Sequence, residues 1–241
     1  MVAYQAVLFD FFGTLTHAVR RGSAHSAVAR ALGCDPATLI QVLDRSFRLR
    51  ASGALGDAEA TLRWAGEQAG GRPTGPALRT AREHRLAAVR ADTRLRPEAT
   101  EVLRALRRAG TRTGLVSDCT HELPDFLPAL PIAPLLDTTV FSVQVGRCKP
   151  DPEIFLDACR RLGVPPRRCL YVGDGGSREL TGATAAGLTA IRLAAPDLAA
   201  HLVFDADREW TGPAIVSLCE VPRLALTGIG TGAVPTGSAA G

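Results

Sequence analysis

The amino-acid sequence predicts an α/β protein with a parallel β-sheet core and an inserted all-α segment. Short apolar runs alternate with helical patterns over residues 95–193, as is typical of a parallel sheet covered by helices. Residues 17–94 interrupt this alternation, because their helical patterns have no strand pattern between them. The chain is 241 residues long, which suffices for a core domain that carries a smaller insert.

The expected strands are short apolar runs that end at polar or small residues. The first covers residues 6–9 and ends directly before Asp10. The other expected strands are residues 114–116, 139–143, 170–172 and 190–193. Helical patterns between the later runs cover residues 97–108, 152–162 and 179–186. Ligands of such sheets bind beyond the carboxyl ends of the strands, so functional residues are expected there.

Four amphipathic helices are expected in the insert, at residues 23–32, 36–50, 57–69 and 76–90. We therefore expect an α/β core formed by residues 1–16 and 95–225 and a helical cap formed by residues 17–94. Residues 226–241 are small, glycine-rich and uncharged, which predicts a flexible tail without a catalytic role.

Composition excludes several classes of protein. The net charge of +4 comes without a long basic block, so no nucleic-acid partner is expected. No apolar run approaches the roughly 20 residues that span a bilayer, so no membrane partner is expected either. The six cysteines form no CxxC pair and the N-terminus resembles no signal peptide, so we expect reduced thiols and a cytoplasmic location.

Four short motifs follow one another along the chain, each at or just beyond the end of an expected strand. The first is Phe-Asp-Phe-Phe-Gly-Thr-Leu around Asp10, and the second is Ser117-Asp118. The third is Lys-Pro-Asp-Pro, beginning at Lys149, the only lysine of the sequence. The fourth is Gly-Asp-Gly-Gly around Asp174, followed by Glu179. Any one of these motifs is weak evidence, whereas all four in this order are specific.

In this order, the motifs closely resemble those of the haloacid dehalogenase superfamily, and the insert resembles the C1 cap of its subfamily I. The resemblance covers residues 5–222. It implies a Rossmann-like parallel sheet with an all-α, C1-type cap, and a hydrolase activity that proceeds through a covalent aspartyl intermediate.

The resemblance also assigns roles to individual residues. Asp10 is implied as the nucleophile, and Ser117 and Lys149 as the other catalytic residues. Ser117 and Lys149 would also bind substrate, together with Asp118, because a phosphoryl group needs cations and hydrogen-bond donors around its developing charge. A lone lysine in a chain that otherwise uses arginine favours a functional amine.

The implied cofactor is Mg²⁺. Its ligands would be the carboxylates of Asp10 and Asp174 and the main-chain carbonyl of Phe12, with waters completing an octahedron. Glu179 occupies the second acidic position of the fourth motif, where aspartate is more usual. A glutamate in the first turn of a helix is also favoured by the helix dipole alone, so both interpretations of Glu179 stay open.

Histidines of the insert are further candidates. His17 lies where the chain leaves the core, so we expect it to face the site and to bind substrate. His25 and His84 fall within helical patterns of the insert and are interpreted as surface residues.

Phe12 departs from the family pattern. Phosphatases of this family usually carry a second aspartate at this position, two residues after the nucleophile, which protonates the leaving group and then activates water. A positioned acid–base group contributes roughly 10²–10⁴-fold to the rate, so its replacement by phenylalanine matters.

Three interpretations therefore remain open. The first is a hydrolase of phosphate esters or anhydrides whose leaving group is already stable, or whose cap supplies a proton donor such as His17. The second is a 2-haloacid dehalogenase, because a halide needs no proton; the motif around Asp174 speaks against it. The third is a non-catalytic or scaffold protein that kept the phosphate pocket.

The first interpretation uses both Lys149 and Asp174 and ranks first. It implies a small phosphorylated metabolite, or another small anionic substrate, as the binding partner of a monomer or homodimer.

Overall fold

The computed structural model describes residues 4–228 and contains one six-stranded sheet in which every paired strand is parallel. The strands are β1 (Ala6–Phe9), β2 (Arg112–Ser117), β3 (Thr138–Phe141), β4 (Cys169–Gly173), β5 (Thr189–Leu193) and β6 (Ala214–Ile215). Their order is β3-β2-β1-β4-β5-β6, so the first strand lies in the middle of the sheet. The predicted α/β, Rossmann-like core is confirmed.

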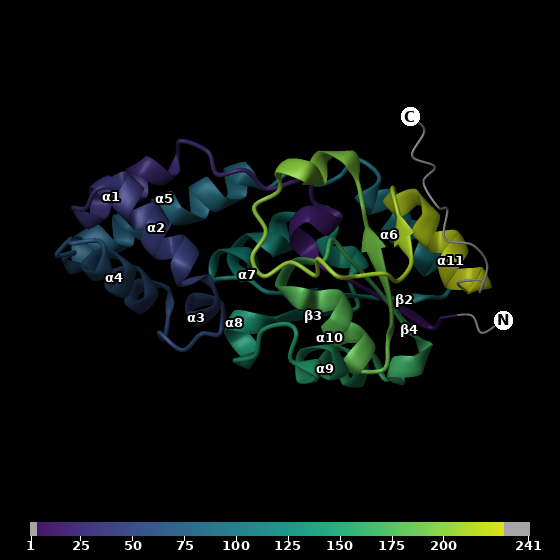
Figure 1. The fold of residues 1–241 in the computed structure, drawn as a ribbon. Helices are drawn as coiled ribbons and strands as arrows, with labels where there is room; N and C mark the ends of the chain where they lie inside the picture. The colour runs from purple at the N-terminus through teal and green to yellow at the C-terminus, as the bar shows by residue number, and fades with distance from the viewer. Residues whose placement is uncertain (1–3, 229–241) are drawn as a thin grey trace, which may run out of the picture.

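Helices cover both faces of this sheet (Figure 1). The core helices are α6 (Ala99–Arg108), α7 (Glu122–Phe126), α8 (Ser142–Val145), α9 (Pro152–Leu162), α10 (Glu179–Ala185) and α11 (Val221–Thr227). Successive side chains of β1 point to opposite faces, so Val7 and Phe9 pack in the hydrophobic cluster that includes residues of α6 and α11. Ala6 and Leu8 pack with residues of α9 and α10 on the other face.

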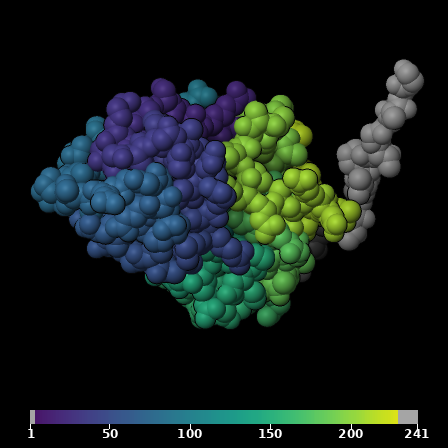
Figure 2. Space-filling view, turned by 60° about the vertical axis from the view of Figure 1, so that its left-hand side comes forward, coloured from purple at the N-terminus to yellow at the C-terminus, as the bar shows by residue number. Residues whose placement is uncertain are grey.

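The insert contains α1 (His25–Leu32), α2 (Pro36–Arg45), α3 (Phe47–Ala51), α4 (Ala58–Gln68) and α5 (Gly75–Asp92). Its buried apolar residues form a hydrophobic cluster of their own, drawn from α1, α2, α4, α5 and Ala69. Figure 2 shows this purple-to-blue helical group beside the green-to-yellow C-terminal part of the core. We propose that residues 17–94 are a cap domain, because the buried residues of their cluster belong to neither cluster of the sheet; Leu86 and Val89 of α5 pack against one of those clusters from the insert.

The elements differ from the expected ones in several places. The expected helix 36–50 is divided into α2 and α3 at Ser46, whose hydroxyl donates to the carbonyl of Val42 at 2.6 Å. The expected strand 139–143 ends at Phe141, where α8 begins. The short strand β6 was not predicted. Helix α11 runs to Thr227, two residues into the expected tail, and residues 229–241 lie outside the described residues.

Two antiparallel linkers join the insert to the core. Thr16 pairs with Leu95, the His17 N–H donates to the Arg94 carbonyl at 2.9 Å, and the Arg96 N–H donates to the Leu15 carbonyl at 2.9 Å. The chain thus leaves and re-enters the core at one point. Among residues 4–228, no helix has the length and apolar character needed to cross a membrane.

Deleting residues 20–90 and joining the ends by a short Gly-Ser linker should leave a core that unfolds cooperatively. We expect this because both clusters that cover the sheet draw most of their members from outside the insert. The measurement is urea unfolding followed by circular dichroism. A deletion variant without a cooperative transition would show that insert and core fold as one unit.

Candidate active site

The four sequence motifs converge at the carboxyl edge of the sheet. Asp10 follows β1, Ser117 ends β2, and Asp174 follows β4. These three strands are neighbours, because β1 pairs with β2 on one side and with β4 on the other. Residues from distant parts of the sequence therefore meet at one place.

Lys149 lies at the centre of this cluster of residues. Its Nζ donates to Oδ1 of Asp10 at 2.6 Å and to Oε2 of Glu179 at 2.5 Å, and it lies 3.3 Å from the Tyr171 hydroxyl. The side chain is 3% exposed. Burial alone would lower the pKa of Lys149, but the charges of Asp10 and Glu179 outweigh it and hold the pKa well above its usual value. Lys149 is therefore a permanent buried cation in contact with the expected nucleophile.

Glu179 is a full member of the site and not a surface helix residue. Its carboxylate is fully buried and accepts hydrogen bonds from the Tyr171 hydroxyl at 2.7 Å and from the Gly175 N–H at 2.9 Å, besides the bond from Lys149. Gly173 makes room for it, because a Cβ at that position would lie 2.1 Å from Oε1 of Glu179. The carboxylate holds the lysine in place.

Three carboxylates crowd around this single lysine. Asp10, Asp174 and Glu179 each place an oxygen within 4.8 Å of the others. Burial raises the pKa of Asp10 to about 7, with Lys149 opposing and Glu179 adding to the rise. Burial, followed by the charges of Glu179 and Asp10, holds the pKa of Asp174 well above its usual value. Ionisation of all three carboxyl groups would therefore leave surplus negative charge, which another cation would balance.

The other two predicted substrate-binding residues of the core differ in their surroundings. Asp118 lines the cavity and accepts the Lys149 main-chain N–H at 2.9 Å, and burial raises its pKa. The Ser117 hydroxyl is completely buried and has no hydrogen-bond partner among the described residues. Ser117 is not among the residues that line the cavity, although it ends the strand that pairs with β1, which Asp10 follows.

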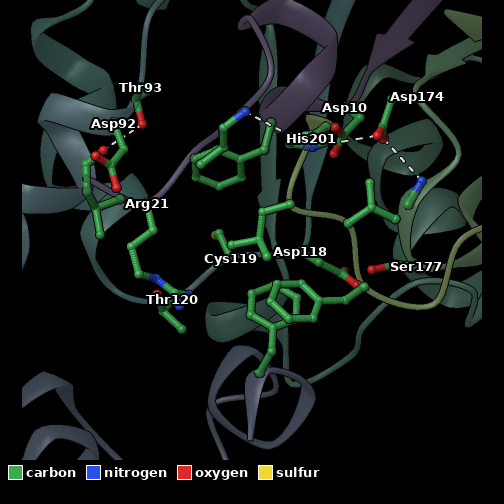
Figure 3. Close-up of a pocket in the computed structure, with 18 of the residues that line it drawn as sticks. Asp10, Arg21, Asp92, Thr93, Asp118, Cys119, Thr120, Asp174, Ser177 and His201 are labelled. Carbon is green, nitrogen blue, oxygen red and sulfur yellow. Dashed lines mark hydrogen bonds and ion pairs between the residues drawn. The ribbon is translucent and has the colours of Figure 1, made fainter. Parts of the chain in front are cut away.

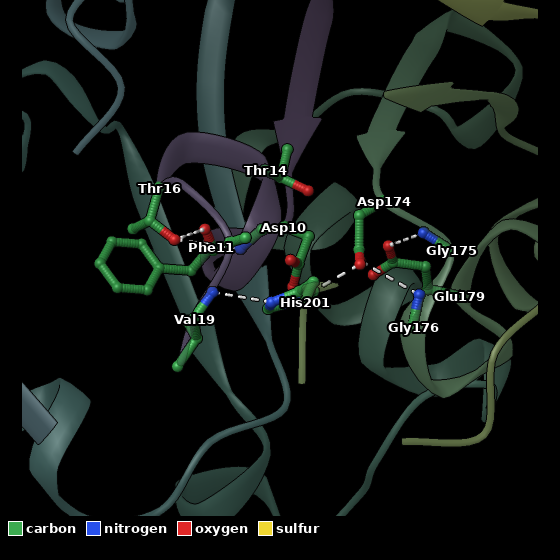
Figure 4. A network of polar contacts seen from close by, with 12 residues as sticks. Asp10, Phe11, Thr14, Thr16, Val19, Asp174, Gly175, Gly176, Glu179 and His201 are labelled. Atoms are coloured by element: carbon green, nitrogen blue, oxygen red, sulfur yellow. Dashed lines mark hydrogen bonds and ion pairs between the residues drawn. The ribbon is translucent and has the colours of Figure 1, made fainter. Parts of the chain in front are cut away.

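Phe12 also lines the cavity and brings no titratable group to it. A histidine that the sequence motifs do not include, His201, lies nearby (Figure 4). Its Nδ1 accepts the Val19 N–H at 2.8 Å, and its Nε2 lies 3.6 Å from Oδ2 of Asp174. A Cβ on Gly13 would lie 2.7 Å from that Nε2, so the glycine permits the close approach. Burial lowers the pKa of His201, which favours a neutral ring.

His17 is not among the residues that line the cavity. Its Nδ1 lies 3.3 Å from Oδ2 of Asp197, a carboxylate that Arg96 also contacts at 3.0 Å. His25 was interpreted as a surface residue, and this is wrong: it is 4% exposed and lines the cavity. It packs there because Nε2 lies 2.7 Å from Oδ2 of Asp92 and Nδ1 lies 3.1 Å from Nη1 of Arg85.

The cavity lies between the core and the insert and has a volume of about 130 Å³. Figure 3 shows Asp10, Asp174 and His201 on one side of it and Arg21, Asp92 and Thr93 on the other. Phe47 of the insert and Phe204 of the core stack across this boundary, with ring centroids 4.4 Å apart and an interplanar angle of 12°. Both rings also line the cavity. Only a small ligand can occupy it in this arrangement.

Comparison with known proteins identifies the family. The family model for haloacid dehalogenase-like hydrolases matches residues 4–187. The chain is 36% identical over 98 residues to the glyceraldehyde 3-phosphate phosphatase of Methanopyrus kandleri, which covers 40% of this chain and 42% of that protein. It is 30% identical over 131 residues to (S)-2-haloacid dehalogenase 1 of Pseudomonas sp. strain CBS-3, which covers 54% and 56% respectively. The chain thus spans about two fifths to about half of the length of these curated relatives.

Solved structures show the same fold. The 2-haloacid dehalogenase of Pseudomonas syringae pv. tomato superposes with a TM-score of 0.64 at 24% sequence identity, covering 93% of this chain and 98% of that one. The chain belongs to the haloacid dehalogenase-like hydrolases. Its named relatives include both phosphatases and dehalogenases.

Gly173→Ala should destabilise the protein by about 1–3 kcal/mol, because the new methyl group collides with a fully buried, hydrogen-bonded carboxylate. Urea unfolding measures the loss. Gly75→Ala is a matched control, since a Cβ at Gly75 meets only the end of the Arg79 side chain, at 3.9 Å. Equal stability of the two variants would mean that Glu179 can move away from Gly173 without loss.

Proposed function

We propose that this hydrolase cleaves phosphate esters or phosphoanhydrides of a small metabolite, with Asp10 as the nucleophile and Mg²⁺ as the cofactor. One observation carries the proposal: Asp10, Asp174 and Glu179 converge within 4.8 Å, while Lys149 is the only lysine or arginine that pairs with them within residues 4–228. A halide leaves without the help of a metal ion, so a halide-displacing enzyme does not need the metal motif around Asp174. A divalent cation would balance the surplus charge.

The residues present fit Mg²⁺. Carboxylate oxygens are its preferred protein ligands, and two carboxyl groups with raised pKa values lie side by side in Asp10 and Asp174. Glu179 is already bonded to Lys149, Tyr171 and Gly175, so Asp10, Asp174 and the Phe12 carbonyl would hold the metal. When bound, the metal would neutralise charge on the phosphoryl oxygens.

The protein's own residues account for the covalent step. A carboxylate oxygen of Asp10 attacks phosphorus, the bond from phosphorus to the leaving oxygen breaks, and an aspartyl phosphate forms. Lys149 favours the ionised form of Asp10 and would face the phosphoryl charge, and the unpartnered Ser117 hydroxyl would donate to a phosphoryl oxygen. Water then attacks the aspartyl phosphate, which releases phosphate and regenerates Asp10.

Phe12 restricts the leaving group. An alcohol leaves poorly unless it is protonated, and the phenylalanine side chain cannot supply the proton. We therefore infer a preference for leaving groups of low pKa, such as aryl or acyl phosphates. The same reasoning predicts slow hydrolysis of the aspartyl phosphate, since no carboxylate at position 12 activates water.

Phe12 also supports a second candidate, the hydrolysis of carbon–halogen bonds in 2-haloacids. Halide leaves without protonation, so this reaction needs no acid at that position. The relatives named (S)-2-haloacid dehalogenases agree with it. Halide release that persists in the presence of EDTA would identify this activity.

Removal of the metal should abolish phosphate release. We expect EDTA to eliminate turnover of p-nitrophenyl phosphate and added Mg²⁺ to restore it. Asp174→Asn should weaken Mg²⁺ binding by roughly tenfold or more, because the site loses one of two coordinating carboxylates. Asp10→Asn should eliminate turnover, since the amide is no nucleophile.

Isothermal titration calorimetry measures the Mg²⁺ affinity directly, apart from activity. Asp157→Asn serves as the control, because Asp157 lies on α9, pairs with Arg160 and Arg161 and does not line the cavity. Phosphate release that is insensitive to EDTA, with unchanged Mg²⁺ affinity in Asp174→Asn, would refute the metal-dependent reaction.

Phe12→Asp should raise turnover of alkyl phosphates by roughly 10–1,000-fold, somewhat below the full contribution of a positioned acid because the geometry is not optimised. Phe12→Leu is the matched control, since it removes the ring without adding an acid. In the wild type, a burst of p-nitrophenol equal to the enzyme concentration should precede slower steady-state release. Equal wild-type rates on aryl and alkyl phosphates, without a gain in Phe12→Asp, would mean that another group already donates the proton.

A further inference from the structure

The cavity has a second charged end, formed by the insert. Arg21, His25, Arg50 and Arg85 line it from the cap side, opposite the carboxylates and Lys149 of the core. Arg50 and Arg85 are only 3% and 8% exposed. Buried guanidinium groups are rare without a bound partner of opposite charge, so their surroundings indicate what they bind.

Arg50 makes no ion pair among residues 4–228. Its Nε donates to the Ser46 hydroxyl at 3.1 Å and its Nη2 to the Leu43 carbonyl at 2.7 Å, and both acceptors are uncharged. The acidic groups around it are bound elsewhere, because Asp44 pairs with Arg21 and Glu122 pairs with Arg85. Burial, and after it the charge of Arg85, lowers the pKa of Arg50 to about 9. Its charge is therefore poorly compensated.

Arg85 is held rigidly beside it. Nε donates to Oε1 of Glu122 at 3.2 Å, and Nη1 donates to Nδ1 of His25 at 3.1 Å. Because His25 accepts at Nδ1, its Nε2 carries the proton that is donated to Asp92. This chain of contacts fixes the plane of the Arg85 guanidinium group.

Each arginine keeps an unused donor. Nη1 of Arg50 and Nη2 of Arg85 make no hydrogen bond to residues 4–228. Neither nitrogen is among the fully enclosed atoms without a partner, so both keep accessible surface, and both side chains line the cavity. Two planar guanidinium groups with free N–H donors recognise an oxyanion well.

We propose that Arg50 and Arg85 bind a second anionic group of the substrate, a carboxylate or a second phosphate, while the reacting group lies at Asp10 and Lys149. This inference rests on the proposed function and narrows its substrate class to small phosphorylated compounds that carry another anion. The small cavity supports it, because both ends are within one space of about 130 Å³. An anion there would also compensate the buried charge of Arg50.

The test compares two probes that differ in the second anion, 2-phosphoglycolate and ethyl phosphate. Binding is measured by calorimetry in the Asp10→Asn background, which prevents turnover. Arg50→Gln should weaken 2-phosphoglycolate binding by roughly 10–100-fold, as expected for loss of a charge-assisted hydrogen bond, and ethyl phosphate binding by less than about threefold. Equal losses for both probes, or no loss for either, would overturn the proposal.

Arg48→Gln is the matched control. Arg48 lies two residues earlier on α3, is exposed and does not line the cavity, so its removal should leave both affinities unchanged. If Arg50→Gln does not fold, the proposal is tested with the Asp10→Asn protein alone. That protein should bind 2-phosphoglycolate at least about tenfold more tightly than ethyl phosphate. A ratio near one would overturn the proposal.

A third probe, ethylene glycol bisphosphate, distinguishes the two anions. Tighter binding than 2-phosphoglycolate, lost in Arg50→Gln, would identify the second group as a phosphate, and weaker binding would identify it as a carboxylate. Binding and turnover measured together also distinguish the proposed phosphatase activity from the proposed anion subsite. Binding that depends on the second anion, without turnover of any phosphate ester, would refute the proposed phosphatase activity and support the anion subsite. Turnover of phosphate esters without a preference for a second anion would support the phosphatase activity and refute the subsite.

Discussion

The ion pairs of Lys149 are the constraint on which the rest of the site depends. A buried ammonium group is tolerated only when carboxylates surround it, and removing one partner of such a pair typically costs about 3–5 kcal/mol. Asp10 and Glu179 satisfy this requirement from opposite sides, at 2.6 Å and 2.5 Å. Because Asp10 follows β1 and Glu179 begins α10 after β4, the pairing of these two strands is what brings the charges together.

Glu179 shows how a local departure from a family pattern can be accommodated by its neighbours. The glutamate is one methylene longer than the usual aspartate, and its carboxylate extends over Gly173, where no Cβ would fit. The Tyr171 hydroxyl and the Gly175 N–H then satisfy the remaining oxygen lone pairs. Lys149 consequently faces Asp10 with a fixed geometry, which an isolated lysine side chain would not keep.

The sequence motifs include Asp10, Lys149 and Asp174 but not His201, and this difference has physical reasons. Strand-end motifs are local signals, so Asp10, Lys149 and Asp174 could be placed at or near strand ends from the pattern, and the family resemblance joined them into one expected site. His201 could not, because it lies in an irregular segment with no periodicity and reaches the site only through tertiary packing. The break of the expected helix 36–50 at Ser46 was equally invisible, since it depends on a side-chain bond to the main chain.

The arginines of the cap did leave a signal in the sequence, although a weak one. Arg85 continues the buried stripe of α5, at a helical spacing from Leu78, Ala81 and Ala88, where an apolar residue is expected. A charged residue in a stripe that otherwise packs inward must either pair or bind a ligand, and Arg50 has no charged partner within the described residues 4–228. The core therefore carries the reacting groups, whose motifs are recognisable in the sequence. The role of the cap arginines can be inferred only from the folded structure, in which the core and the insert line the same cavity. With Phe12 in place of the usual acid, the proposed phosphatase chemistry relies on positioning the substrate, and the cap arginines are the groups placed to do so.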